Sequence, residues 1–184
     1  MDGKMATREQ LVITSFHEAG HAVMAMSAGF MVTELSCVTS ADDQGHVIWQ
    51  PPQLTTNGSH VASVLAYTAG MAADFLHWKA TAAHDGDELC IGAQDDQAKA
   101  QKHLITLGHQ DFFEDYLAFS IGHLQKPDVW SWVEFLAQTL RVTGVINGQD
   151  VLCKAWQDIP KISHQELEFF WLAIERKLTP KLAF

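Results

Sequence analysis

The pattern of apolar and polar positions predicts a chain built mainly from α-helices. From Leu11 to Ala28 the residues are apolar around nearly the whole circumference of a helix, and no proline interrupts them. Such a helix has to lie at the centre of the fold, because every face of it needs a packing partner. Gly29 can end this helix, and the sequence TREQ, which begins at Thr7, has the spacing of a capping box that can start it.

The remaining pattern predicts one β-hairpin and a series of further helices. Two β-prone runs, 32–39 and 46–50, flank the turn sequence ADDQG and indicate the hairpin. A second helix over 60–78 carries small residues that allow another helix to approach closely, namely Ala66, Ala69, Gly70 and Ala73. An acidic loop is expected over 80–91, and further helices over 93–107, 111–124, 128–142, 149–157 and 164–177. The predicted fold is therefore mainly α with a small β-hairpin, in a single domain over residues 1–184.

The tryptophans do not change this picture. Trp130, Trp132 and Trp171 fall at helical spacings, which is typical of core positions. A docking face for another protein is the alternative interpretation.

Composition and charge exclude several classes of function. The chain has 184 residues, of which 47% are hydrophobic and 18% charged, as in globular proteins. Its net charge of −10 argues against nucleic-acid binding, which needs clustered lysine and arginine. The most apolar run, 22–32, is too short to span a membrane, and the N-terminus lacks the apolar stretch of a signal peptide. Three cysteines without a CxxC pair fit reduced thiols, so we expect a soluble cytoplasmic protein.

Candidate chemistry lies in the first helix, in the motif HEAGH. His17 and His21 are four residues apart and therefore share one helix face, so that both imidazoles can bind one metal ion. Glu18 can reach a water held by that ion without binding the ion itself, as a general base requires. Gly20 costs about 1 kcal/mol relative to alanine inside a helix, which indicates that something packs closely against it.

A catalytic zinc ion also needs a third protein ligand. Spacing alone leaves ten downstream candidates: His46, His60, Asp74, His77, His84, Asp85, Asp87, Glu88, Asp95 and Asp96.

The motif HEAGHAV, followed far downstream by GAQDD over 92–96, resembles the peptidase domain of the FtsH family of zinc metalloproteases. The resemblance implies a zincin-like helical metallopeptidase domain with a small β-hairpin. It further implies that His17, His21 and Asp96 bind Zn²⁺ and that Glu18 is the catalytic base. Other landmarks are similar in the segments 45–52, 69–74 and 146–150, so the resemblance covers roughly 10–152 and is strongest over 16–25 and 92–98.

The sequence also departs from the family pattern. Met71 stands where the family has arginine, and Cys90-Ile91 where it usually has threonine before Gly-Ala. No GxxxxGK[ST] loop of an ATPase occurs in these 184 residues. We therefore expect an endopeptidase that acts, without ATP as an isolated chain, on unfolded or flexible polypeptides. A separate unfoldase partner or a homo-oligomer is compatible with the sequence.

Two alternatives stay open at this stage. The chain can be a zinc-binding interaction module of the same family with weak or no turnover, or a helical domain without metal. Asp74 can accept a hydrogen bond from a ligating histidine or serve packing alone, and Asp95 can simply complement a helix N-terminus. The group that stabilises the oxyanion is not identified; His46, His60 and His84 are candidates, although surface or capping roles suit them better.

Overall fold

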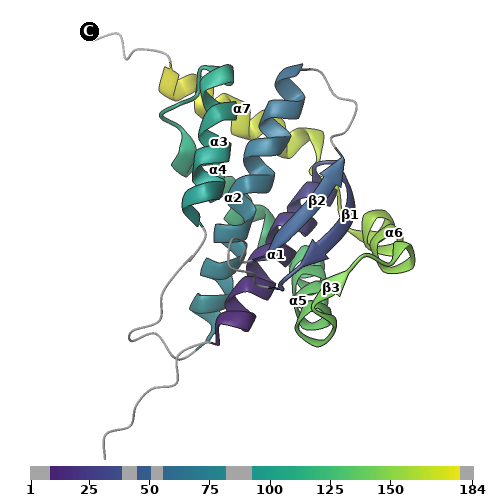
Figure 1. Ribbon diagram of the computed structural model, residues 1–184. Coiled ribbons are helices and arrows are strands. Elements are labelled where there is room, and N and C mark those ends of the chain that lie inside the picture. Colours follow the sequence, from purple (N-terminus) through teal and green to yellow (C-terminus); the bar gives the residue numbers. More distant parts are fainter. Residues whose placement is uncertain (1–8, 39–44, 51–55, 82–92, 179–184) are drawn as a thin grey trace, which may run out of the picture.

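The computed structural model describes residues 9–38, 45–50, 56–81 and 93–178 (Figure 1). These ranges contain seven α-helices and three short strands. The helices are α1 (Gln10–Ser27), α2 (Thr56–Ala80), α3 (Ala93–Leu107), α4 (Phe113–Leu124), α5 (Pro127–Thr143), α6 (Gln149–Asp158) and α7 (His164–Leu178). The strands are β1 (Met31–Ser36), β2 (His46–Gln50) and β3 (Val145–Ile146). A mainly helical fold with a small sheet is thus confirmed.

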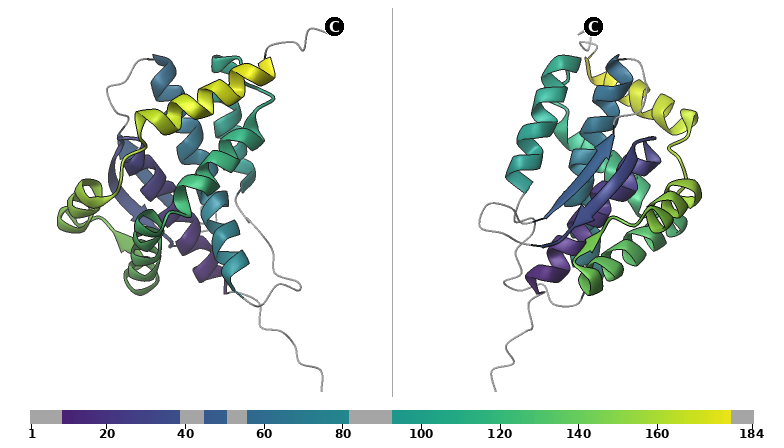
Figure 2. Two further views of the ribbon diagram at one scale, coloured as in Figure 1. Left: turned by 180° about the vertical axis from the view of Figure 1, so that it is seen from behind. Right: turned by 45° about the vertical axis from the view of Figure 1, so that its right-hand side comes forward.

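Helix α1 is the centre of the molecule. All of its residues from Ile13 to Ser27 are buried. Helices α2 and α5 pack against it, and the sheet lies along another of its sides (Figures 1 and 2). The prediction of a central helix, made from its apolar circumference, is confirmed.

The start of α1 was predicted wrongly. Glu9 has an extended backbone, with φ −66° and ψ 142°, and is the N-cap, so the helix begins two residues later than the capping box implied. The carbonyl of Glu9 accepts the first helical hydrogen bonds, from Val12 and Ile13 N–H at 2.9 and 3.2 Å. Thr7 itself lies outside the described residues.

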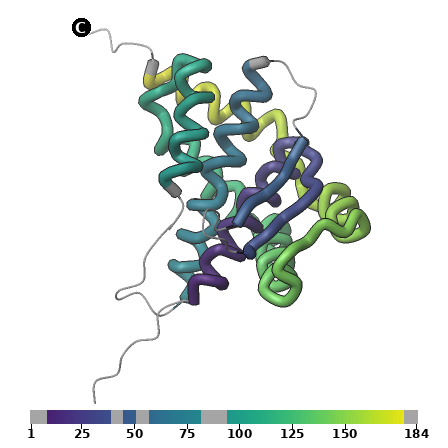
Figure 3. Tube along the Cα trace, in the orientation of Figure 1, coloured from purple at the N-terminus to yellow at the C-terminus, as the bar shows by residue number. Residues whose placement is uncertain are grey.

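The sheet has the strand order β2-β1-β3, and both pairs are antiparallel. The predicted hairpin is present as β1 and β2, which lie across α1 in the trace of Figure 3, although its turn lies outside the described residues. The third strand was not predicted. It has two residues, which pair with Leu35 and Ser36, and a segment this short shows no periodicity that could reveal it.

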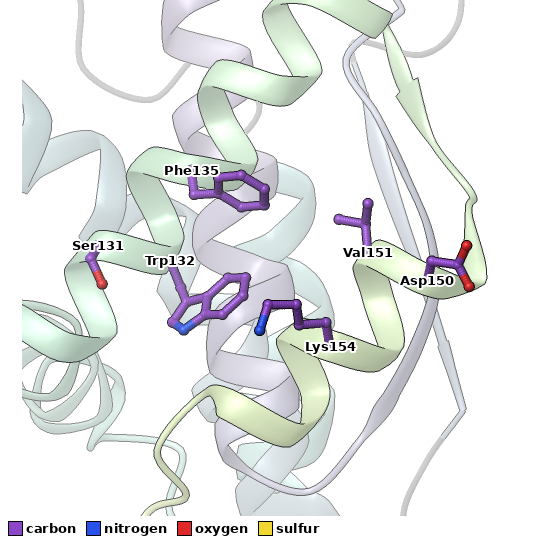
Figure 4. Close-up of a pocket in the computed structure, with 6 residues that line it drawn as sticks. All are labelled: Ser131, Trp132, Phe135, Asp150, Val151 and Lys154. Atoms are coloured by element: carbon purple, nitrogen blue, oxygen red, sulfur yellow. The ribbon is translucent and has the colours of Figure 1, made fainter.

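The three tryptophans of the predicted helices are partly buried and pack against the core, as the first interpretation expected. The ring centroid of Trp130 lies 6.0 Å from that of Phe16. Trp132 and Phe135 of α5 face α6 across a cavity of about 440 Å³, which Val151 and Lys154 line from the other side (Figure 4).

Two further findings concern the cysteines and the lengths of the apolar helices. Cys37 is buried and Cys153 exposed, both as free thiols, whereas Cys90 lies outside the described residues. Over the described ranges, none of the helices is both long enough and apolar enough to cross a membrane.

Helix α7 is held to the rest of the fold through Glu166 in its first turn. One carboxylate oxygen accepts hydrogen bonds from the backbone N–H and the hydroxyl of Ser163, at 3.0 and 2.8 Å, in a capping box. The other oxygen pairs with Lys126 and lies 3.3 Å from His123 Nδ1. Burial alone would raise the pKa of Glu166, but these partners outweigh it and lower the pKa to about 2.

Replacement of Glu166 by glutamine should therefore reduce the free energy of unfolding at neutral pH. We expect a loss of about 1 kcal/mol, a discounted value because the side chain is 29% exposed and solvent screens its partners. The ordinary pKa is 4.5, so the stabilisation is fully present above that pH and is lost as the pH falls towards 2. Urea unfolding of wild type and Glu166→Gln across this pH range measures the effect.

The matched control is Glu168→Gln, which removes a carboxylate from an exposed position on the same helix. It should leave the stability unchanged. A difference between wild type and Glu166→Gln that does not shrink in acid would contradict the role given to this carboxylate.

Candidate metal centre

Three side chains from two helices converge on one point inside the molecule. Asp96 Oδ2, on α3, lies 2.9 Å from His17 Nε2 and 3.0 Å from His21 Nε2, on α1. The two Nε2 atoms are 3.0 Å apart. The side chains of His17, His21 and Asp96 are only 8%, 5% and 13% exposed. This group could hold a metal ion, and within the described ranges it is the one such group of three or more ligand side chains.

The spacing of the three atoms suits a divalent ion. Ligand atoms of a tetrahedral zinc ion lie about 3.3 Å apart, so the observed separations have to widen by only a few tenths of an ångström. The chain reaches this geometry because i and i+4 share a face of α1 and because Asp96 stands in the first turn of α3.

Hydrogen bonding prepares His21 as a ligand. Its Nδ1 lies 2.7 Å from the backbone carbonyl of Ala66, which can only accept, so Nδ1 carries a proton and the neutral ring presents the Nε2 lone pair to the centre. Ligating histidines usually have such a partner. His17 differs, because its buried Nδ1 has no hydrogen-bond partner among the described residues.

Two glycines create the space for this arrangement. A Cβ atom at Gly70 of α2 would lie 2.4 Å from His21 Nε2 and 2.6 Å from His17 Nε2, inside the volume on which the ligands converge. A Cβ atom at Gly20 of α1 would lie 2.4 Å from that of Ala73 on α2. The close packing expected from Gly20 and from the small residues of α2 is therefore observed, and it brings both imidazoles against the backbone of Gly70.

The carboxylate and the imidazoles perturb each other strongly. Burial lowers the pKa of His21, but the nearby Asp96 carboxylate outweighs burial and raises it to about 9. Burial likewise raises the pKa of Asp96, but the two histidines bring it far below its usual range. Without an ion, the cluster is stabilised by a positive charge on an imidazole, a role that a bound metal cation would take over.

Glu18 lies beside this cluster and is only 6% exposed. Its carboxylate also raises the pKa of His21, although by less than the Asp96 carboxylate does. Gly45, directly before β2, has φ 135°, and a Cβ atom there would lie 2.8 Å from Glu18 Oε1. Glycine at position 45 thus satisfies the backbone conformation and leaves room for the carboxylate.

The other described candidates for the third ligand lie elsewhere. His46 pairs with Glu34 at 3.1 Å, and Asp95 with Lys99 at 2.6 Å. His77 stacks on Phe16, with ring centroids 3.8 Å apart. The remaining described candidates, His60 and Asp74, both lie on α2; His60 contacts His103, and Asp74 is fully buried. His84, Asp85, Asp87 and Glu88 lie outside the described residues.

Sequence reasoning missed two aromatic residues near the centre. The Trp49 ring of β2 lies 6.4 Å from that of His21, and the Tyr67 ring of α2 lies 5.5 Å from Trp49. Tyr67 is three residues before Gly70 and so shares its helix face, but the position of β2 could not be foreseen from the sequence.

Substitution of Gly70 by alanine should weaken zinc binding at least about tenfold, because the methyl group would occupy the volume between the imidazoles. Titration of metal-free protein against a chromophoric zinc chelator measures the affinity. Gly122→Ala on α4 is the matched control, since a Cβ atom there has no neighbour within 4 Å. Equal zinc affinity of a folded Gly70→Ala variant and of Gly122→Ala would contradict the location of the site.

Comparison with protein-family models finds no family that matches this chain, and comparison with curated proteins finds no matching relative. The function therefore has to be argued from the chemistry of the site itself.

Proposed function

We propose that this protein is a zinc-dependent endopeptidase that hydrolyses peptide bonds in unfolded or flexible polypeptides. One observation carries the proposal. Asp96, which is 75 residues beyond His21 in the chain, meets both histidines of an HExxH motif at hydrogen-bonding distance. Two imidazoles and one carboxylate are a common ligand set of catalytic zinc, which keeps one position open for water or substrate.

In this proposal His17, His21 and Asp96 hold the ion. A bound zinc ion would polarise the scissile carbonyl and make water acidic enough to be deprotonated near neutral pH. Ala66 keeps the ring of His21 in the orientation and tautomer that a ligand needs. Gly70 keeps the space beside both rings free of side-chain atoms.

Glu18 is the proposed general base. It follows His17 directly and so lies one step around α1 from the ligand face, beside the ion but not in the ligand set. Its carboxylate would take a proton from the attacking water and pass it to the leaving amine. A purely structural metal site has no need of a buried carboxylate in this position, which makes Glu18 the residue that favours catalysis.

Strand β2 is the proposed guide for the substrate. It stands at one edge of the sheet, and its outer side has no strand partner among the described residues. Trp49 links this strand to the centre, because its ring lies 6.4 Å from His21. An extended polypeptide that adds to this edge would present its backbone to the ligands.

These features also support the proposed zincin-like identity and the resemblance to FtsH-family peptidases. We further propose a cytoplasmic location, because Cys37 and Cys153 are free thiols, and an unfoldase partner for folded substrates.

A second candidate is a zinc-binding interaction module with little or no turnover. The observation that favours it is the buried Nδ1 of His17, which has no partner among the described residues. Loss of such a partner typically weakens metal affinity or activity 10- to 100-fold.

Glu18→Gln should separate the two functions. We expect the zinc-loaded variant to retain its metal but to cleave a denatured, fluorescently labelled polypeptide at least about a hundredfold more slowly, the usual contribution of a general base. Glu9→Gln, an exposed change at the start of the same helix, should leave the rate unchanged. A zinc-loaded wild type without cleavage would favour the interaction module, and full activity of Glu18→Gln would refute the assigned base.

A further inference from the structure

Helices α2 and α3 are joined by a pair of histidines away from the metal centre. His60 on α2 and His103 on α3 have their Nδ1 atoms 2.7 Å apart, and the centroids of the two rings lie 5.0 Å apart. This is the geometry of a hydrogen bond in which the Nδ1–H of one ring donates to the Nδ1 lone pair of the other. Both side chains are half-buried, so protons from solvent can reach the pair.

This hydrogen bond belongs to the interface that also positions Asp96. Helix α3 packs along α2 (Figures 1 and 3). His103 is seven residues beyond Asp96 on α3, and His60 is ten residues before Gly70 on α2. The bond therefore lies about 10–15 Å from the metal centre along the helix axes, on the helix that supplies the third ligand.

We propose that this bond is an acid-sensitive latch between α2 and α3, which secures the helix that carries Asp96 and is lost when both rings are protonated. A neutral pair holds one proton between the two Nδ1 atoms. The first added proton keeps the bond, because an imidazolium can donate to a neutral ring. The second added proton leaves two donors and two positive charges face to face, so repulsion replaces the bond.

The surroundings of the pair oppose the second proton. Burial, and then the neighbouring His60, lower the pKa of His103 below its ordinary value of 6.5. The Tyr67 ring stacks on His103, with centroids 5.8 Å apart, and Lys99 Nζ lies 5.9 Å from the Tyr67 centroid, which adds a positive charge nearby. The stabilisation of the fold by the bond is therefore fully present above pH 6.5 and is lost as the pH falls through the lowered pKa.

Carboxylates do not offset this effect. Within the described ranges, neither ring of the pair forms an ion pair with an aspartate or a glutamate. On α4, which packs against both α2 and α3, Asp115 pairs with Lys177 and His123 with Glu166, and Glu114 is exposed. A second positive charge on the pair would thus have no anionic partner there.

The latch can be tested apart from the metal centre. Acid also protonates the ligands of that centre, so a fall in zinc affinity with pH does not identify the latch. Its effect on catalysis rests on the proposed function, whereas the bond between the two rings does not. Metal-free protein therefore reports on the latch whether or not the zinc-loaded protein cleaves peptides.

The test is a double-mutant cycle with His60→Ala, His103→Ala and the double variant, unfolded by urea without metal at about pH 8 and at about pH 5. At the higher pH we expect the pair to favour the folded state about fivefold, the usual net contribution of one hydrogen bond. At the lower pH this coupling should vanish or reverse. In the nitrogen NMR spectrum of the wild type, scalar coupling between the two Nδ1 atoms should be present at the higher pH and lost at the lower, which serves if a variant does not fold.

The matched control replaces His103→Ala by His164→Ala, which removes an exposed histidine at the start of α7. This second cycle should show no coupling to His60 at either pH. A coupling between His60 and His103 that is absent at the higher pH, or that is equally strong in acid, would overturn the proposal.

Discussion

Helices α1 and α2 approach each other so closely that neither Gly20 nor Gly70 has room for a methyl group. This packing brings the carbonyl of Ala66 to 2.7 Å from His21 Nδ1, and so determines which nitrogen of that ring faces the centre. It also places both imidazoles against the backbone of Gly70. The candidate metal site is thus a product of helix packing in the core, completed when α3 brings Asp96 against the same two rings.

The electrostatics of the cluster of His17, His21 and Asp96 favour a bound cation. Two imidazoles and a carboxylate are buried together in this cluster. Removal of one partner from a buried pair of charged groups typically lowers the free energy of unfolding by several kcal/mol. A core built only for stability would use apolar residues of the same volume. The Asp96 carboxylate raises the pKa of His21 against the effect of burial, so this environment favours a positive charge. A divalent cation would meet that demand, and the proposed role of Glu18 as general base depends on such an ion.

Much of this could be predicted from the sequence, and most of what could not be predicted depends on tertiary packing. The apolar circumference of α1, the common face of His17 and His21 and the small residues of α2 are local patterns, and the structure agrees with them. Spacing left Asp96 among ten candidates, and only the resemblance to a family singled it out.

What was missed depends on how elements that are distant in sequence come together. The two-residue strand β3, the aromatic contact between Trp49 and Tyr67, and the meeting of His60 with His103 all arise from tertiary packing. The late start of α1 is a local error, because the Glu9 backbone is extended where a capping box would have required a helix.

The most direct test of the central claim is elemental analysis of protein purified without added metal, for wild type and Asp96→Ala in parallel. The account predicts one tightly held zinc ion per chain in the wild type and its loss in the folded variant. Wild-type protein without a bound metal ion, or a variant that keeps the zinc of the wild type, would contradict the three-ligand centre.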